Sequence, residues 1–245
     1  MKRWVAFRSI IVKDMRSYYL KPPNVSWGLV FPLAWTGMFF VRSGADPSEL
    51  RALLPGVMTL AVLFGTTSLL AVAITFERKA RSLERLLLAP VPLSLLMFAK
   101  TAGAIAFGIL NAFVPVALAA FFTSLAGINW PALVAGVVLT AVSSAFLGLL
   151  VAVSVAEVFE AQTLSNFFRF PMVFLCGLFF PLERLPFWLR PLSYALPPTW
   201  GADIMHQAVG RPGILPLGLD FLILAAFCLA LFMASLRAIN RRWIA

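Results

Sequence analysis

The sequence predicts an all-α integral membrane protein with six transmembrane helices. Of its 245 residues, 61% are hydrophobic and only 12% are charged, whereas soluble domains have about 25% charged residues. Several windows of about 20 residues contain no charge, and this length crosses a hydrocarbon core of roughly 30 Å as a helix. The net charge of +10 comes from basic residues gathered at the ends of apolar segments, as in orientation signals. This placement argues against nucleic-acid binding.

Residues 1–23 are predicted to form an amphipathic helix that lies in the membrane interface, with its basic side toward water. The helix is expected over Lys2 to Leu20, and Pro22 and Pro23 should end it. Helical spacing gathers apolar side chains on one face and polar side chains on the opposite face: Trp4, Phe7, Ile11, Met15 and Tyr18 against Lys2, Ser9, Lys13 and Arg16.

Residues 24–245 are predicted to form the membrane domain. Its six apolar segments are Val25 to Val41, Ala52 to Thr75, Thr101 to Leu125, Trp130 to Ala156, about Leu164 to Phe180, and Ile214 to Leu236. An even number of spans puts both termini on one side. That side receives 15 of the 20 lysines and arginines if Arg169 is counted there, so both termini are expected in the cytoplasm.

The connection between the last two spans is unusual, because it is rich in proline and polar groups yet contains many large apolar side chains. We expect short re-entrant helices at about 181–205, dipping into the outer face of the membrane where protein or a water-filled cavity covers them. An outer loop with an aromatic belt is the alternative.

Motifs of soluble catalysis are absent from the sequence. It contains no GxxxxGK[ST], HExxH, CxxC or GxSxG. Cys176 and Cys228 lie in apolar segments and are interpreted as packing residues. The lone His206 has no Cys or His at ligand spacing and is assigned to a surface or interface. No metal or cofactor site is expected in this chain, and any energy for transport should come from another polypeptide.

The segment Phe76 to Pro92 is the strongest candidate for receiving such energy. It has six charges in the nine positions from Glu77 to Arg85, although apolar segments flank it, so it must lie at a membrane surface. A helix over 77–89 would put polar residues on one face and apolar residues on the other: Glu77, Arg81, Glu84, Arg85 and Leu88 against Ala80, Leu83, Leu86 and Leu87. A lipid-surface anchor is the alternative.

This segment resembles the cytoplasmic loop of type 2 ABC export permeases, whose usual form is FERE-x-GT-LERLLLAPVSR. The matching residues are Phe76, Glu77, Arg78, Leu83, Glu84, Arg85, Leu86, Leu87, Ala89, Pro90 and Val91. The departures are Lys79 for the second acid, Arg81 for glycine and Ser82 for threonine. Phe170 to Trp200 is similar to the same family's fifth span and outer helices, with Cys176 for serine and Pro198 for leucine.

The resemblance implies the permease subunit of an ATP-driven exporter in the inner (plasma) membrane. Such a subunit acts as a homodimer with two ABC ATP-binding subunits, which bind ATP and Mg, while the permease itself is not an enzyme. The loop would be a coupling helix that docks on the ATPase through Glu77, Arg78, Arg81, Glu84 and Arg85. The Glu84→Lys substitution is expected to abolish transport without preventing membrane insertion. The outer gate would involve Gly177, Phe180, Pro181, Leu185, Pro186, Trp188 and Pro197.

Cargo and the polar groups inside the spans leave alternatives open. An amphipathic drug-like or lipid-like molecule is the favoured cargo, with polysaccharide or glycolipid export, a non-transporting scaffold and an ion-coupled carrier as alternatives. Arg169 is expected to extend to the cytoplasmic interface; otherwise it faces the subunit seam and meets an anionic headgroup, Glu157 or Glu160. Asp220 either caps the re-entrant region or pairs with Arg211 or Arg190.

Overall fold

The structure is a computed structural model that describes residues 2–42, 47–88, 92–178 and 181–244. These residues form helices and connecting turns without any strand. The longer helices are α1 (Lys2–Asp14), α2 (Pro22–Arg42), α3 (Pro47–Lys79), α5 (Leu93–Ala119), α6 (Trp130–Ser154), α7 (Val158–Leu175), α9 (Pro197–Ala208) and α10 (Leu217–Ile239). The shorter elements are a π-helical turn η1 (Met15–Tyr19), α4 (Ser82–Leu87), a 3-10 turn η2 (Leu182–Arg184), α8 (Arg190–Tyr194) and a π-helical turn η3 (Asn240–Ile244).

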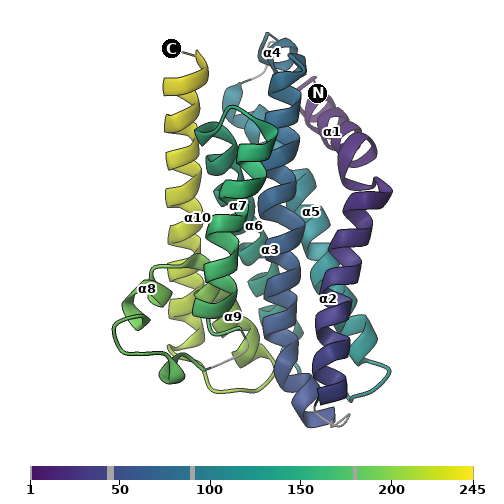
Figure 1. Cartoon of the computed structure of the whole chain (residues 1–245), viewed down its shortest axis with the longest axis vertical. Coiled ribbons are helices and arrows are strands. Elements are labelled where there is room, and N and C mark those ends of the chain that lie inside the picture. Colours follow the sequence, from purple (N-terminus) through teal and green to yellow (C-terminus); the bar gives the residue numbers. More distant parts are fainter. Residues whose placement is uncertain (1, 43–46, 89–91, 179–180, 245) are drawn as a thin grey trace.

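Helix α3 is the centre of the bundle. It packs against α2, α5, α6, α7 and α9, and Figure 1 shows it running through the middle with α2 and α10 toward opposite sides. Glycines allow the closest contacts. A β-carbon added to Gly148 of α6 would lie 2.4 Å from the backbone oxygen of Thr67, and one added to Gly108 of α5 would lie 2.3 Å from a methyl group of Thr66. Small residues thus let both helices approach the central one.

Four of the described helices are long and apolar enough to cross a membrane: Glu49–Lys79, Ser94–Ala119, Trp130–Ser154 and Leu217–Arg242. They correspond to the predicted spans two, three, four and six, so the prediction of an all-α membrane protein is confirmed. The predicted spans one and five fall on α2 and α7, which are not among the four, and six crossings therefore remain a prediction.

The N-terminal segment is helical up to Tyr19 and turns before Pro22. Pro22 then begins α2, where its missing N–H costs nothing because the first helical N–H groups have no partner within the helix. Part of the predicted apolar face of this segment packs on the bundle: Phe7, Met15 and Tyr18 lie against the buried core, and the ring of Phe7 stacks on Phe98 of α5 at 6.1 Å. Trp4 is exposed, and its immersion in a membrane interface remains a prediction.

The two ends of the bundle differ in construction. Both termini and α4 lie at one end, and α8 and α9 lie at the other (Figure 1). The segment with the dense charges is therefore far from the proline-rich segment.

Candidate coupling surface and outer segment

The charged segment is two helices rather than one. Helix α3 ends at Lys79, a turn follows at Ala80 and Arg81, and α4 begins at Ser82. Arg81 has φ of 55°, in the left-handed region that favours glycine. The expected continuous helix over 77–89 is therefore wrong, and Glu77 does not share one helical face with Arg85. Residues 89–91 and the side chain of Glu84 lie outside the described part of the structure.

Four charged side chains form a cluster at this end of the bundle, which we call the charge cluster: Lys13, Asp14, Glu77 and Lys100. Lys13 Nζ lies 2.5 Å from Glu77 Oε1 and 3.3 Å from Asp14 Oδ1. Lys100 Nζ lies 2.9 Å from Asp14 Oδ1 and also pairs with Glu77. The two positive and two negative charges balance, and they connect α1, α3 and α5.

Burial and pairing act in opposite directions in this cluster. Burial raises the pKa of the Asp14 carboxyl above its ordinary value, although the charge of Lys100 opposes this shift. Burial lowers the pKa of Lys13, but the hydrogen bond and the charge of Glu77 outweigh it, so that the pKa of Lys13 is raised. The Glu77 side chain is only 16% exposed, so most of its surface is covered within this chain.

Arg78 also makes its contact inside the chain. Its Nη2 donates to the backbone oxygen of Val155 at 2.7 Å, and Arg242 Nη1 donates to the backbone oxygen of Ser154 at 2.9 Å. Ser154 is the last residue of α6 and Val155 comes directly after it. Both oxygens therefore belong to the end of this helix, where carbonyl groups lack helical partners and the helix dipole is negative. Two arginines from distant parts of the sequence thus stabilise one helix end.

Arg81 and Arg85 remain as the outward cations of this segment. Both are exposed, and neither makes an ion pair with a described residue. Lys79 is engaged with Glu157 at 2.5 Å. Of the five residues that the sequence analysis assigned to coupling, the structure thus uses Glu77 and Arg78 internally and leaves Arg81 and Arg85 available. Whether they contact an ATPase remains a prediction.

Residues 181–216, which the sequence predicts on the outer side and which we call the outer segment, contain η2, α8 and α9. Their re-entrant character, their side and their depth in a membrane remain predictions. Among the predicted gate residues, Pro181, Pro186 and Trp188 are exposed, Gly177 and Leu185 are half-buried and Pro197 is buried at the start of α9. Gly177 has φ of 71°, which glycine adopts without strain. Phe180 lies outside the described residues.

Helix α9 is the buried part of this segment and packs on α6 and α10. A β-carbon on Gly201 would lie 2.1 Å from Thr140 Oγ1 of α6. Trp200 Nε1 donates to the backbone oxygen of Tyr194 at 3.0 Å and thereby joins α9 to α8. The glycine and the tryptophan fix α9 against the bundle.

Asp220 caps the outer segment rather than pairing with an arginine. Gln207 Nε2 of α9 donates to Asp220 Oδ2 at 2.6 Å, and the backbone N–H of Ile214 donates to Asp203 Oδ2 at 2.9 Å. Arg190 instead donates to the backbone oxygen of Glu183 at 2.6 Å. The first alternative for Asp220 is therefore supported by the contacts, and pairing with Arg190 or Arg211 is not observed.

Arg169 does not extend to the cytoplasmic interface. Its side chain is buried between α7 and α3, and Nη1 donates to Ser68 Oγ at 2.7 Å. The favoured expectation for this residue is wrong, because the guanidinium finds polar partners inside the bundle. No contact with Glu157 or Glu160 is present among the described residues.

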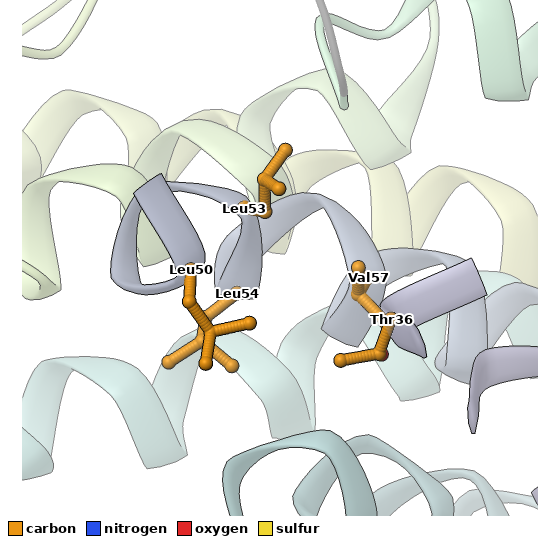
Figure 2. Close-up of a pocket in the computed structure, with 5 residues that line it drawn as sticks. All are labelled: Thr36, Leu50, Leu53, Leu54 and Val57. Carbon is orange, nitrogen blue, oxygen red and sulfur yellow. The ribbon is translucent and has the colours of Figure 1, made fainter. Parts of the chain in front are cut away.

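A small apolar recess lies between α2 and α3. It is lined by Thr36, Leu50, Leu53, Leu54 and Val57 (Figure 2), and it has no room for a water molecule. The recess therefore offers no binding site for cargo in this conformation.

The helical bundle, its four potential spans and its two distinct ends define a multi-helix membrane protein. The profile of the ABC-2 type transporter family matches residues 5–209. The chain belongs to this family and is the membrane subunit of a transporter.

Curated relatives align with this chain over almost its whole length. The chain is 25% identical over 246 residues to the protein named inner membrane transport permease YadH of Escherichia coli strain K12, covering 97% of this chain and 96% of that protein. The protein of the same name from Shigella flexneri matches with the same identity and coverage.

Proposed function

We propose that the chain is the permease subunit of an ATP-driven exporter in the inner membrane. Two copies would form the transport path and two separate ABC ATP-binding subunits would bind ATP and Mg. The favoured cargo is an amphipathic drug-like or lipid-like molecule that leaves the inner leaflet. Both termini and α4 would lie in the cytoplasm, and α2 and α7 would complete six spans.

The observation that supports coupling most strongly is the division of charges around α4. Glu77 belongs to the charge cluster and Arg78 binds the end of α6, whereas Arg81 and Arg85 are exposed on the turn and on α4. An ATPase groove that receives α4 should therefore present carboxylates. Exposed opposite charges across an interface direct association and fix the register of docking.

Co-purification with the ATP-binding subunit tests this proposal. The double reversal R81E/R85E should abolish co-purification and stimulation of ATP hydrolysis, since two attractive contacts become repulsive. This variant leaves the charge cluster intact, which a reversal of Glu77 would not. The outer arginines Arg184 and Arg211 are also exposed, so R184E/R211E is the matched control and should retain the partner.

Unchanged co-purification of R81E/R85E would refute the coupling role of α4. If the wild-type chain binds no ATP-binding subunit from its own genome, the proposal of an ATP-driven exporter fails as a whole.

A further inference from the structure

Arg169 is a buried cation with incomplete contacts. Its Nη1 donates to Ser68 Oγ at 2.7 Å, its Nη2 contacts Asn166 Oδ1, and Cζ lies 3.8 Å from the ring centre of Phe64. Its Nε is buried without a hydrogen-bond partner among the described residues, and so is Ser165 Oγ one turn earlier on α7. Unpaired donors in a protein interior are costly, so this seam has unused capacity to bind an acceptor.

The guanidinium lies deep in the bundle. Its partner Ser68 is nine residues before Glu77 on α3, which corresponds to about 14 Å at 1.5 Å per residue. This distance is close to half of the roughly 30 Å hydrocarbon core. Because α3 is one of the four helices able to cross a membrane, a bilayer crossed by α3 would place Arg169 near its middle, where a cation calls for a counter-charge.

No acid among the described residues forms an ion pair with the Arg169 guanidinium. All ten acidic residues lie outside the long apolar segments or within a turn or so of their ends: Asp14, Asp46, Glu49, Glu77, Glu84, Glu157, Glu160, Glu183, Asp203 and Asp220. A second copy does not change this, because the two-fold axis of a dimer in one membrane is perpendicular to the bilayer and keeps each residue at its depth. A full counter-charge for Arg169 would therefore come from a molecule other than this chain.

We infer that Arg169 binds the anionic headgroup of an amphipathic molecule, a phosphate or a carboxylate, and that this molecule is the cargo. The inference rests on the proposed transport function and narrows its substrate class. Ser68 and Ser165 would offer hydroxyl groups beside the guanidinium.

The apolar body of the molecule has a matching surface on the same helix. Phe167, Phe170 and Phe174 of α7 are exposed. The Phe64 ring contacts Phe170 edge to face, with ring centres 6.4 Å apart, and also covers the guanidinium. Rotation of Phe64 would connect the buried cation with this aromatic surface.

Binding of an amphipathic anion to the full-length chain tests the inference without any ATPase. The chain is placed in phosphatidylcholine nanodiscs that contain dodecyl phosphate, phosphatidylglycerol or both, and retained molecules are counted by native mass spectrometry. The wild type should retain about one dodecyl phosphate per chain. R169Q should bind about 10- to 100-fold more weakly, the effect of losing a charged hydrogen-bond partner. R169K should retain part of the affinity.

The matched control is Arg237, an exposed arginine in the last turn of α10. R237Q should bind like the wild type. Equal retention by R169Q and the wild type would overturn the inference. Phosphatidylglycerol that excess dodecyl phosphate does not displace would also overturn it, because the site would then hold a resident lipid rather than cargo.

A folding defect does not obstruct the test. If R169Q fails to fold, the wild type alone decides: it must prefer dodecyl phosphate to uncharged dodecyl maltoside, and equal retention of the two overturns the inference. Failure of the ATPase to co-purify would refute the exporter proposal and leave this binding result unaffected, so the two failures are distinguishable.

Discussion

Replacing Lys100 by methionine should destabilise the protein strongly. The Lys100 side chain is 3% exposed and pairs with Asp14 and Glu77, whose side chains are 7% and 16% exposed. Methionine has a similar length without the charge, so K100M leaves two covered acids with only Lys13 beside them. Removing one partner of a buried ion pair costs about 3–5 kcal/mol.

The lower end of that range applies here, because Lys13 still neutralises one of the two acids. A loss of about 3 kcal/mol corresponds to a decrease in Tm of roughly 6–12 °C for a domain of this size. The matched control is K79M. Lys79 and Glu157 form an ion pair whose side chains are 60% and 54% exposed, and such pairs contribute about 0–1 kcal/mol.

Thermal unfolding in a mild detergent, followed by tryptophan fluorescence, provides the measurement. The triple variant D14N/E77Q/K100M should recover much of the lost Tm, since neutral side chains replace the uncompensated charges. If K100M has the same Tm as K79M, the charge cluster does not hold α1, α3 and α5 together and the reasoning is refuted.

Three further substitutions probe the helix contacts and the turn. G148A should lower the free energy of unfolding by about 1–3 kcal/mol, because its methyl group meets a backbone oxygen of α3 that cannot move aside; unchanged unfolding would contradict this packing. R81G should raise the free energy of unfolding by about 1 kcal/mol, because glycine adopts the left-handed backbone at this position without strain. The same unfolding assay measures it, and a lower free energy of unfolding would contradict the strain at Arg81. D203N should speed hydrogen exchange at the Ile214 amide, which donates to this carboxylate, and an unchanged rate would show that the contact is dispensable.

The sequence predicted the features that depend on local composition. Long charge-free segments predicted α3, α5, α6 and α10, because a helix that crosses a membrane needs a continuous run of apolar residues. The end of the first helix before Pro22 was also predictable, because proline restricts the residues before it.

The charge cluster could not be predicted in the same way. Asp14 and Lys100 are 86 residues apart, and their contact depends on how α1 packs on α5. Helical periodicity contains no information on tertiary contacts. It therefore predicted that Lys13 faces water and that Glu77 is available to a partner. One feature of the sequence did indicate the break at Arg81: the family pattern that this segment resembles has glycine at that position.

The contacts of Glu77 explain why coupling should be sought on α4 and not on the whole charged segment. An acid held by two lysines from α1 and α5 is already neutralised, so a partner would have to break two ion pairs before using it. Breaking them would separate the end of α3 from both neighbours. Under the proposed function, a partner that displaces α4 through its exposed arginines would move the end of α3 through the Arg81 turn, and the intact cluster would carry that movement to α1 and α5. Glu77, one of the five residues assigned to docking from the sequence, would therefore be better placed to transmit movement between helices than to bind a partner.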